Sequence, residues 1–230
     1  VYFGVELFVV DDEVLIINKD SDKSLMNSDY VVFDTETTGF NATAGDQMIE
    51  IGAVKIKNGT ITDRFDELIN PGFKLKEWTT IFTNITDEML ENKDDEETVV
   101  KWFKEWIGDA PMVAQNARFD ISLMESAYQK YNLGTFDNVV LDTMEISKVQ
   151  NPEATKHSLS ALVKRYGVHF EEDKHHRADY DAEGTARVFD KMLKALISGY
   201  ETISDLKKLV NPDLAYKMNR PYHVTVYAIN

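Results

Sequence analysis

The sequence lacks cysteine altogether and contains no long hydrophobic run. Without cysteine, disulfide bonds and thiolate metal sites are excluded. No apolar stretch approaches the roughly 18 residues that a membrane-spanning helix needs, and no secretory signal opens the chain. We therefore expect no membrane among the binding partners, and a location in the reducing cytoplasm fits the missing cysteines.

Positive charge is also scarce, because 25 Lys and Arg residues face 40 Asp and Glu residues and the net charge is −15. Proteins that bind nucleic acid usually draw on clustered Lys and Arg. If this chain handles nucleic acid, metal ions must hold it or a partner must deliver it. The 230 residues, 43% of them hydrophobic, are enough for one well-buried core with material to spare.

Three zones follow one another along the chain. Residues 1–27 hold two apolar runs, 5–10 and 14–17, which predict two strands joined by a turn. Residues 28–199 alternate strands and helices, with a hairpin signal at Asn58-Gly59 between strands 48–57 and 60–69 and a long final helix from 178 to 197. Residues 200–230 predict a helical piece and a strand at 223–229. The pattern indicates an α/β three-layer domain, and a chain that starts without Met is expected to be a fragment.

The first candidate site follows a buried strand that begins at Tyr30. Asp34 and Glu36 come two residues apart at its end, so their side chains project from the same face. Two neighbouring carboxylates repel each other unless a cation lies between them, and Mg²⁺ prefers such oxygen ligands. The alternative is that the acids merely decorate a solvated strand end, so the hypothesis needs partners elsewhere.

Two further segments offer those partners. Asp120 lies in the first turn of an expected helix, where the alternative is an ordinary helix-start residue. Asp181 lies early in the last helix, on its buried side, where a carboxylate is costly without a partner. His176 precedes it in the loop and can accept a proton near neutral pH, although adjacent histidines are also common in polar loops.

These segments resemble the DEDD exonucleases, in the subclass whose last motif is H-x-A-x-x-D. The three motifs are Asp34-Thr35-Glu36-Thr37-Thr38-Gly39, Asn116-Ala117-Arg118-Phe119-Asp120 and His176-Arg177-Ala178-Asp179-Tyr180-Asp181. Relatives often have His where Gln115 stands, which puts one neighbouring contact in doubt and leaves the acid in place. The resemblance covers roughly residues 30–196, and three motifs in order are a strong signal.

The resemblance implies a ribonuclease H-like fold with a central mixed sheet, and a 3′→5′ exonuclease that uses two Mg²⁺ or Mn²⁺ ions. By the same resemblance, Asp34 bridges both ions, while Glu36 and Asp181 hold the ion that orients the attacking water. Asp120 holds the second ion through water. His176 is the general base.

For the substrate, the resemblance implies that Thr37, Thr38, Gly39 and Asn116 position the terminal nucleotide. Aromatic residues near loops, Phe40 and Phe82, are candidates for base contacts, whereas Phe103 and Tyr131 are expected in the core.

The two ends of the chain carry a second resemblance. Gly4-Val5-Glu6 and residues 220–226 resemble segments of the polymerase-and-histidinol-phosphatase-like domain of PolC-type bacterial DNA polymerase III. This implies proofreading of a single-stranded 3′ DNA end, with the remainder of a replicative polymerase as partner. Glu6 and His223 would then fall on metal-ligand positions of the host domain, although an exposed edge-strand Glu and His explain them equally well.

Two rival functions stay open. An exoribonuclease of the same fold would share every catalytic residue, because RNA is distinguished at its 2′-hydroxyl and no motif here reads that contact. A catalytically silent module for polymerase assembly is the other rival. The presence of all five catalytic positions argues against it.

Overall fold

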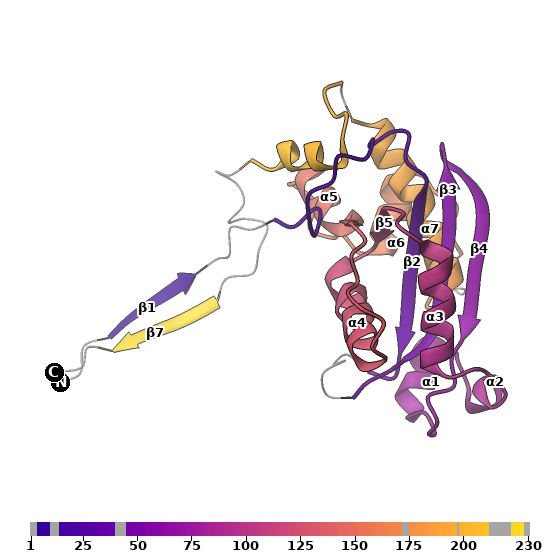
Figure 1. Cartoon of the computed structure of the whole chain (residues 1–230). Coiled ribbons are helices and arrows are strands. Elements are labelled where there is room, and N and C mark those ends of the chain that lie inside the picture. The colour runs from indigo at the N-terminus through magenta and orange to yellow at the C-terminus, as the bar shows by residue number, and fades with distance from the viewer. Residues whose placement is uncertain are drawn as a thin grey trace.

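A mixed five-stranded sheet forms the centre of the computed structural model, which describes residues 4–9, 14–39, 45–171, 175–196, 198–211 and 222–227 (Figure 1). Its strand order is β4-β3-β2-β5-β6. The strands are β2 Tyr30–Thr37, β3 Met48–Lys57, β4 Thr60–Leu68, β5 Met112–Ala114 and β6 Val140–Asp142. β4, β3 and β2 pair antiparallel, while β2, β5 and β6 pair parallel. The expected central mixed sheet is confirmed.

Helices cover both faces of this sheet. They are α1 Glu77–Thr83, α2 Asp87–Leu90, α3 Glu96–Ile107, α4 Ala117–Lys130, α5 Thr143–Gln150, α6 Leu159–Arg165, α7 Ala178–Lys194 and the 3-10 helix η3 Ile203–Leu209. Alternation along β2 divides the core, because Val31 and Phe33 pack with residues of α3 and α4, while Val32 packs with residues of α6 and α7. The three-layer α/β architecture is therefore confirmed.

The hairpin between β3 and β4 forms where the sequence predicts it. Asn58 and Gly59 have φ of 50° and 74°, the left-handed conformation that a two-residue hairpin loop requires. At Gly59 a side chain would also meet the carboxylate of Asp190, because an added Cβ would lie 2.3 Å from its Oδ1.

The expected second strand at residues 14–17 is wrong. Ile17 forms only an isolated bridge with Leu141, and Ile16 and Ile17 are buried in the core on the α6 and α7 side. The segment runs beside β6 instead, where the Ile16 carbonyl accepts a hydrogen bond from the Asp142 N–H at 2.9 Å. Burial of two isoleucines at the sheet edge therefore outweighs pairing with residues 5–10, of which 5–9 belong to β1 Gly4–Val9.

The division at residues 27 and 200 stays a prediction, and the packing bears on it. Leu25, Ile203 and Leu206 belong to the same buried cluster as Val32 and Phe189 of the central domain. Parts of both expected flanks thus complete the core of the middle zone. Helix α1 was not expected from the sequence.

A second, two-stranded sheet pairs the two ends of the chain. β1 Gly4–Val9 runs antiparallel to β7 Tyr222–Tyr227, with Glu6 opposite Thr225, and Figure 1 shows this ribbon extending away from the central domain. The strand expected at 223–229 is confirmed as far as 227, and its last two positions lie outside the described residues. Metal binding by Glu6 and His223 stays a prediction. In the described part of the chain, no helix combines the length and apolarity that a membrane crossing demands.

Candidate metal centre

A cleft of about 810 Å³ opens at the end of β2, where the predicted acids lie. It is lined by Asp34, Thr35, Glu36, Thr37, Gly39, Trp78, Phe82, Gln115, Asn116, Phe119, Met144, Lys148, His157, Ser158, Leu159, His175, His176 and Asp181. The lining comes from β2, α1, the β5–α4 junction, α5, the start of α6 and the loop before α7. Every layer of the domain therefore contributes to one cavity.

Three of the four predicted acids meet in this cleft. Asp34 and Glu36 continue the face of β2 on which Val32 packs toward α7, and Asp181 comes from the first turn of α7. One carboxylate oxygen from each of the three lies within 4.8 Å of the others. The expectation that Asp34 and Glu36 project from one side is thus confirmed.

The acid cluster is electrostatically strained in the absence of a cation. Burial, followed by the charges of Asp120, Glu36 and Asp181, raises the pKa of Asp34 well above its usual value. Burial and the charge of Asp181 raise the pKa of Glu36 to about 8. Buried carboxylates of this kind are stabilised by paired cations or by metals. The oxygen donors therefore fit a hard divalent cation such as Mg²⁺ or Mn²⁺.

Asp120 reaches the site from the other layer of the fold. Thr35 points to the opposite face of β2 from its two acidic neighbours, and its hydroxyl donates a hydrogen bond to Asp120 Oδ1 at 2.6 Å. Burial raises the pKa of Asp120 to about 7, and the bond from Thr35 acts in the opposite direction. Asp120 is close enough to add to the repulsion at Asp34.

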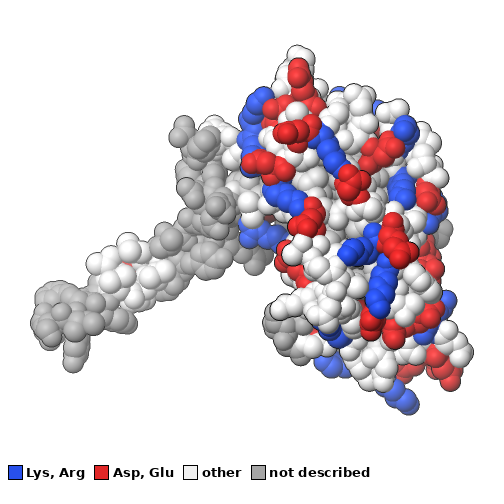
Figure 2. Space-filling view, in the orientation of Figure 1, with Lys and Arg blue, Asp and Glu red and all other residues white. Residues whose placement is uncertain are grey.

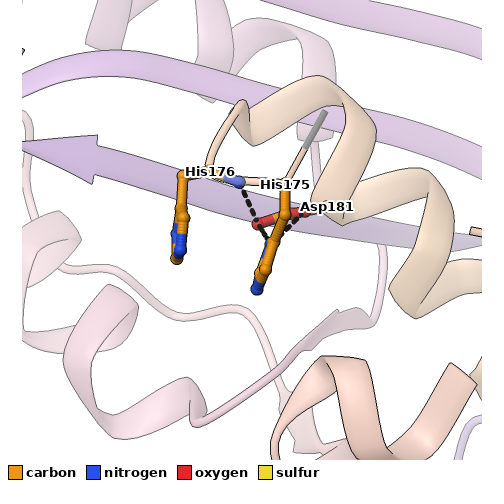
Figure 3. Close-up of side chains that lie close together, drawn as sticks. All are labelled: His175, His176 and Asp181. Carbon is orange, nitrogen blue, oxygen red and sulfur yellow. Dashed lines mark hydrogen bonds and ion pairs between the residues drawn. The ribbon is translucent and has the colours of Figure 1, made fainter. Parts of the chain in front are cut away.

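Two histidines lie against Asp181, as Figure 3 shows. Nδ1 of His175 lies 2.9 and 2.7 Å from the two Asp181 carboxylate oxygens, while the backbone N–H of His176 donates to Oδ2 at 3.2 Å. The two imidazoles stack with ring centroids 4.0 Å apart. The residue that contacts Asp181 through its ring is therefore His175, which the motif did not single out.

The ring of His176 is held in the cleft from its other side. Its centroid lies 4.2 Å from that of Phe82, which α1 supplies. His176 has a φ of 67°, a conformation that non-glycine residues adopt rarely and that functional loops often contain. Burial and the charge of His175 lower the pKa of His176, so the ring favours its neutral form. A neutral imidazole can accept a proton.

The predicted nucleotide-positioning residues divide into two groups. Thr37, Gly39 and Asn116 line the cleft. Thr38 is buried beside it, where its hydroxyl accepts from the Gln47 N–H at 3.0 Å and its carbonyl accepts from the Thr79 hydroxyl at 3.4 Å. Thr38 therefore joins β2 to α1. Phe40 lies outside the described residues.

Asn116 stands at the start of α4, where its side chain makes no capping hydrogen bond. Asn116 has a φ of 65°, and the N–H groups of Asn116 and Ala117 donate instead to the carboxylate of Asp142, at 3.1 and 3.0 Å. Burial, followed by the charge of Glu145, raises the pKa of Asp142 to about 6. The sequence signal for this buried acid was only its position at the end of a strand.

Glu50 is a second acid that sequence reasoning missed. It lies on β3 opposite Glu36, is fully buried, and accepts two hydrogen bonds from the Arg177 guanidinium, at 2.9 and 2.6 Å. Its other oxygen accepts from the Ala178 N–H at 2.9 Å. The Glu50–Arg177 pair thus fixes the start of α7, which carries Asp181, against the strand beside Asp34.

Gln115, where relatives often have His, uses both ends of its amide within the cleft wall. Nε2 donates to the His157 carbonyl at 2.7 Å, and Oε1 accepts from the Thr143 hydroxyl at 2.6 Å. In this chain the residue joins β5 to α5 and to the loop before α6.

Phe103 is fully buried in the core, as expected. Tyr131 is only partly buried there, and its hydroxyl donates to Glu96.

Comparison with known proteins gives matches over the same region. A family model described as Exonuclease matches residues 31–189. The DNA polymerase III PolC-type of Staphylococcus haemolyticus (strain JCSC1435) is 44% identical over 225 residues, 97% of this chain and 15% of the relative. That of Staphylococcus epidermidis (strain ATCC 12228 / FDA PCI 1200) is 44% identical over 232 residues, 99% of this chain and 16% of the relative. The chain therefore spans less than a fifth of these relatives.

Solved structures share the fold. Exonuclease X in complex with 5′ overhanging duplex DNA aligns with a TM-score of 0.60 and 25% identity, over 77% of this chain and 98% of that one. The nuclease domain of 3′hExo, a DEDDh family member bound to rAMP, aligns with a TM-score of 0.62 and 17% identity, over 78% and 96% of the two chains.

Proposed function

The chain belongs to the exonuclease family, and from this premise we propose that it removes nucleotides from the 3′ end of single-stranded or frayed DNA, as a proofreading module of a replicative polymerase. The observation that carries the proposal is the convergence of Asp34, Glu36 and Asp181 within 4.8 Å in a cleft that His176 also lines. The 44% identity to polymerase III chains supports DNA as the substrate.

The proposed metal ligands follow from the acid cluster. Asp34, Glu36 and Asp181 would hold one divalent cation, Mg²⁺ or Mn²⁺, and Asp120 with Asp34 would hold a second. Ions bound there supply Lewis-acid activation of the phosphate and of the attacking water. Hydrogen bonds fix two of these carboxylates, because the Thr35 hydroxyl donates to Asp120 and the His176 N–H donates to Asp181.

His176 acts as the general base in this proposal. Its pKa is lowered by burial and by the charge of His175, so the ring is neutral and ready to take the proton of the nucleophilic water. Phe82 on one side and His175 on the other limit its movement.

The terminal nucleotide is held by side chains and backbone around the same cavity. Thr37, Gly39 and Asn116 line it near the acids, while Phe82 and Trp78 present aromatic surface from α1. Aromatic side chains stack on bases without regard to sequence, which suits an enzyme that must remove any nucleotide. Thr38 positions its neighbours Thr37 and Gly39, because its carbonyl accepts a hydrogen bond from the Thr79 hydroxyl in α1.

The acidity of the chain agrees with a protein that does not hold DNA through its own surface charge. On the face drawn in Figure 2, the described acidic and basic side chains alternate, and broad one-signed regions are not seen there. A protein with net charge −15 gains little from general electrostatic attraction to DNA. Bound cations, and a polymerase that already holds the duplex, would supply the attraction to DNA that the chain's own charge does not provide. The proposal places the module with that polymerase in the cytoplasm.

The test is a nuclease assay on 5′-labelled single-stranded DNA and RNA of matched sequence, with Mg²⁺, Mn²⁺ or EDTA. We expect metal-dependent shortening of DNA from its 3′ end, abolished in Asp181→Ala. Shortening of RNA alone would instead identify an exoribonuclease. A wild-type chain that is folded by circular dichroism yet inert with every metal would identify a silent module.

A duplex assay tests proofreading separately. A mispaired 3′ terminus should be removed faster than a paired one, because a mispaired base costs less to unstack and unpair. Equal rates on both ends would contradict the proofreading role while leaving the exonuclease proposal intact.

A further inference from the structure

The cleft extends beyond the acids to a second wall. Gln115, Met144, Lys148, His157, Ser158 and Leu159 line it there, and we call these residues the α5 wall. Helix α5 follows β6, which is two strands away from β2 in the sheet. The α5 wall therefore lies on the β6 side of the acid cluster, and the catalytic motifs assign no function to its charged residue.

Lys148 is that residue. Among the described residues that line the cleft, it alone is a lysine or arginine. Its ammonium group donates to Glu145 Oε1 at 2.6 Å, which uses one of its three N–H groups. Within the described residues, two donors are then left for a ligand in the cavity.

Glu145 keeps Lys148 in this position. The Glu145 side chain is only 10% exposed, and within the described residues its Oε2 is buried without a hydrogen-bond partner. A buried carboxylate that lost the cation paired with it would be strongly destabilised. Lys148 is therefore held at the wall instead of swinging freely into solvent.

Two cations, Lys148 and Arg165, act on His157, which also lines the cleft. The pKa of His157 is lowered by burial and then by the charges of Arg165 and Lys148, with Glu145 acting the other way. Both ring nitrogens of His157 are engaged, Nδ1 with the Ser147 hydroxyl at 2.9 Å and Nε2 with the Ala154 carbonyl at 3.0 Å. This end of the cleft contrasts with the acid cluster at β2.

The direction in which the DNA strand leaves the metal centre determines which part of the substrate Lys148 can contact. In a 3′→5′ exonuclease the terminal nucleotide occupies the metal centre, so the rest of the strand leaves the cleft toward its 5′ end. Any further phosphate in the cleft must therefore lie on the 5′ side of the scissile linkage. A positive, immobilised ammonium group is the chemistry that recognises such a phosphate.

We propose that Lys148, braced by Glu145, forms a subsite for an internucleotide phosphate on the 5′ side of the scissile linkage. The inference rests on the proposed 3′→5′ exonuclease activity and adds a residue that aligns the strand for it. Lys148 is a positioning residue, because it contacts the backbone and not the reacting atoms. It binds any sequence equally, since phosphate contacts carry no base information.

The experiment compares two substrates that differ only in the presence of this phosphate. The p-nitrophenyl ester of thymidine 5′-monophosphate has a single phosphodiester, whereas a thymidine oligonucleotide has further phosphates on the 5′ side. In the full chain with Mn²⁺, Lys148→Gln should lower kcat/KM on the oligonucleotide relative to the ester by about 3- to 10-fold, mainly through KM. Lys148→Arg should restore most of this ratio.

Salt dependence gives a readout that a purely structural effect would not move. For Lys148→Gln, the slope of log KM against log salt on the oligonucleotide should fall by about 0.7, the value for one lost phosphate contact on a single strand. Lys101→Gln is the matched control, because Lys101 forms a similar 2.5 Å ion pair with Glu97 on α3 and lies outside the α5 wall.

Each outcome is decisive. An unchanged ratio and slope in Lys148→Gln, with wild-type shortening of DNA intact, would overturn the subsite. An equal loss on ester and oligonucleotide would also overturn it, since the residue would then support the fold or the metal centre. If the wild-type chain cleaves neither substrate, the proposed function fails before the subsite is tested.

Discussion

Alternation along one strand divides the chemistry of this site between two layers at the scale of single residues. Asp34 and Glu36 face α7 and Asp181, while Thr35 between them faces α4 and bonds Asp120. The segment from Asp34 to Glu36 therefore lies beside acids from two helices, α4 and α7, that are far apart in sequence. The carboxylates are buried together at an electrostatic cost that a divalent cation would offset.

Substitution of the proposed base should affect turnover more than binding. We expect His176→Ala to lower kcat by about 10²- to 10⁴-fold, with a small change in KM, because general-base catalysis contributes in that range. Steady-state kinetics on single-stranded DNA measures this. His169→Ala is the control, since His169 is exposed on the surface and should retain wild-type kcat. Equal losses in the two variants would contradict the assignment.

At the scale of secondary-structure elements, the site depends on how the start of α7 is held against β3. Glu50 binds both the guanidinium of Arg177 and the N–H of Ala178. The backbone of α7 also approaches β3 closely at Gly52, where an added Cβ would lie 2.0 Å from the Asp179 nitrogen. Both contacts place Asp181 next to Asp34.

Removal of the cation from the Glu50–Arg177 pair should destabilise the fold. Arg177→Ala leaves a buried carboxylate close to the acid cluster, and we expect a loss of about 2–4 kcal/mol in the free energy of unfolding. Urea denaturation measures it. Arg187→Ala, which breaks the solvent-exposed pair with Glu183 on the same helix, should cost less than about 1 kcal/mol. A similar loss of stability in Arg177→Ala and Arg187→Ala would show that the buried pair stabilises the fold no more than the exposed pair does.

A side chain at Gly52 should separate α7 from the sheet. The clash in Gly52→Ala involves backbone atoms that cannot rotate away, so we expect a loss of about 3 kcal/mol or more. Thermal unfolding and metal-dependent activity should both decline. Lys57→Ala, at an exposed position on the same strand, should stay within about 0.5 kcal/mol of wild type. Wild-type stability of Gly52→Ala would refute this close packing.

The acid cluster should govern the pH dependence of stability at the scale of the whole molecule. The pKa of Glu36 is about 8 in the folded chain and near 4.5 in the unfolded chain. Between these pH values the native state therefore binds more protons than the unfolded state. Stability without metal should therefore fall as pH rises from about 4.5 to 8. Thermal unfolding in EDTA across this range measures the slope.

Two controls assign this pH dependence to the cluster. Saturating Mg²⁺ should flatten the slope, because a ligand that binds the folded state stabilises it most when the carboxylates are ionised. Glu36→Gln should make it shallower without metal, since the neutral amide cannot ionise, whereas Asp34 and Asp120, whose pKa values are also raised, still can. A slope that neither change alters must arise from other groups.

Local patterns were sufficient for most elements. The hairpin at Asn58-Gly59, the helix α7 and the strands β2, β3 and β4 follow from turn chemistry and hydrophobic periodicity, which act over a few residues. The strand prediction for residues 14–17 was wrong, because a short apolar run is compatible both with a strand and with a buried irregular segment beside β6. Helix α1 was missed because Trp78, Ile81 and Phe82 leave its apolar residues exposed.

The sequence by itself determined the α/β class and the order of the main elements. It also singled out Asp34, Glu36, Asp120 and Asp181 as candidate ligands, because each lies at a strand end or a helix start within a motif. The tertiary structure alone decided that His175 contacts Asp181 and that Asp142 and Glu50 hold the helices that carry the site. It also placed Lys148 in the same cleft. These partners are separated by many residues or lie in irregular loops, so only packing of the layers brings them together.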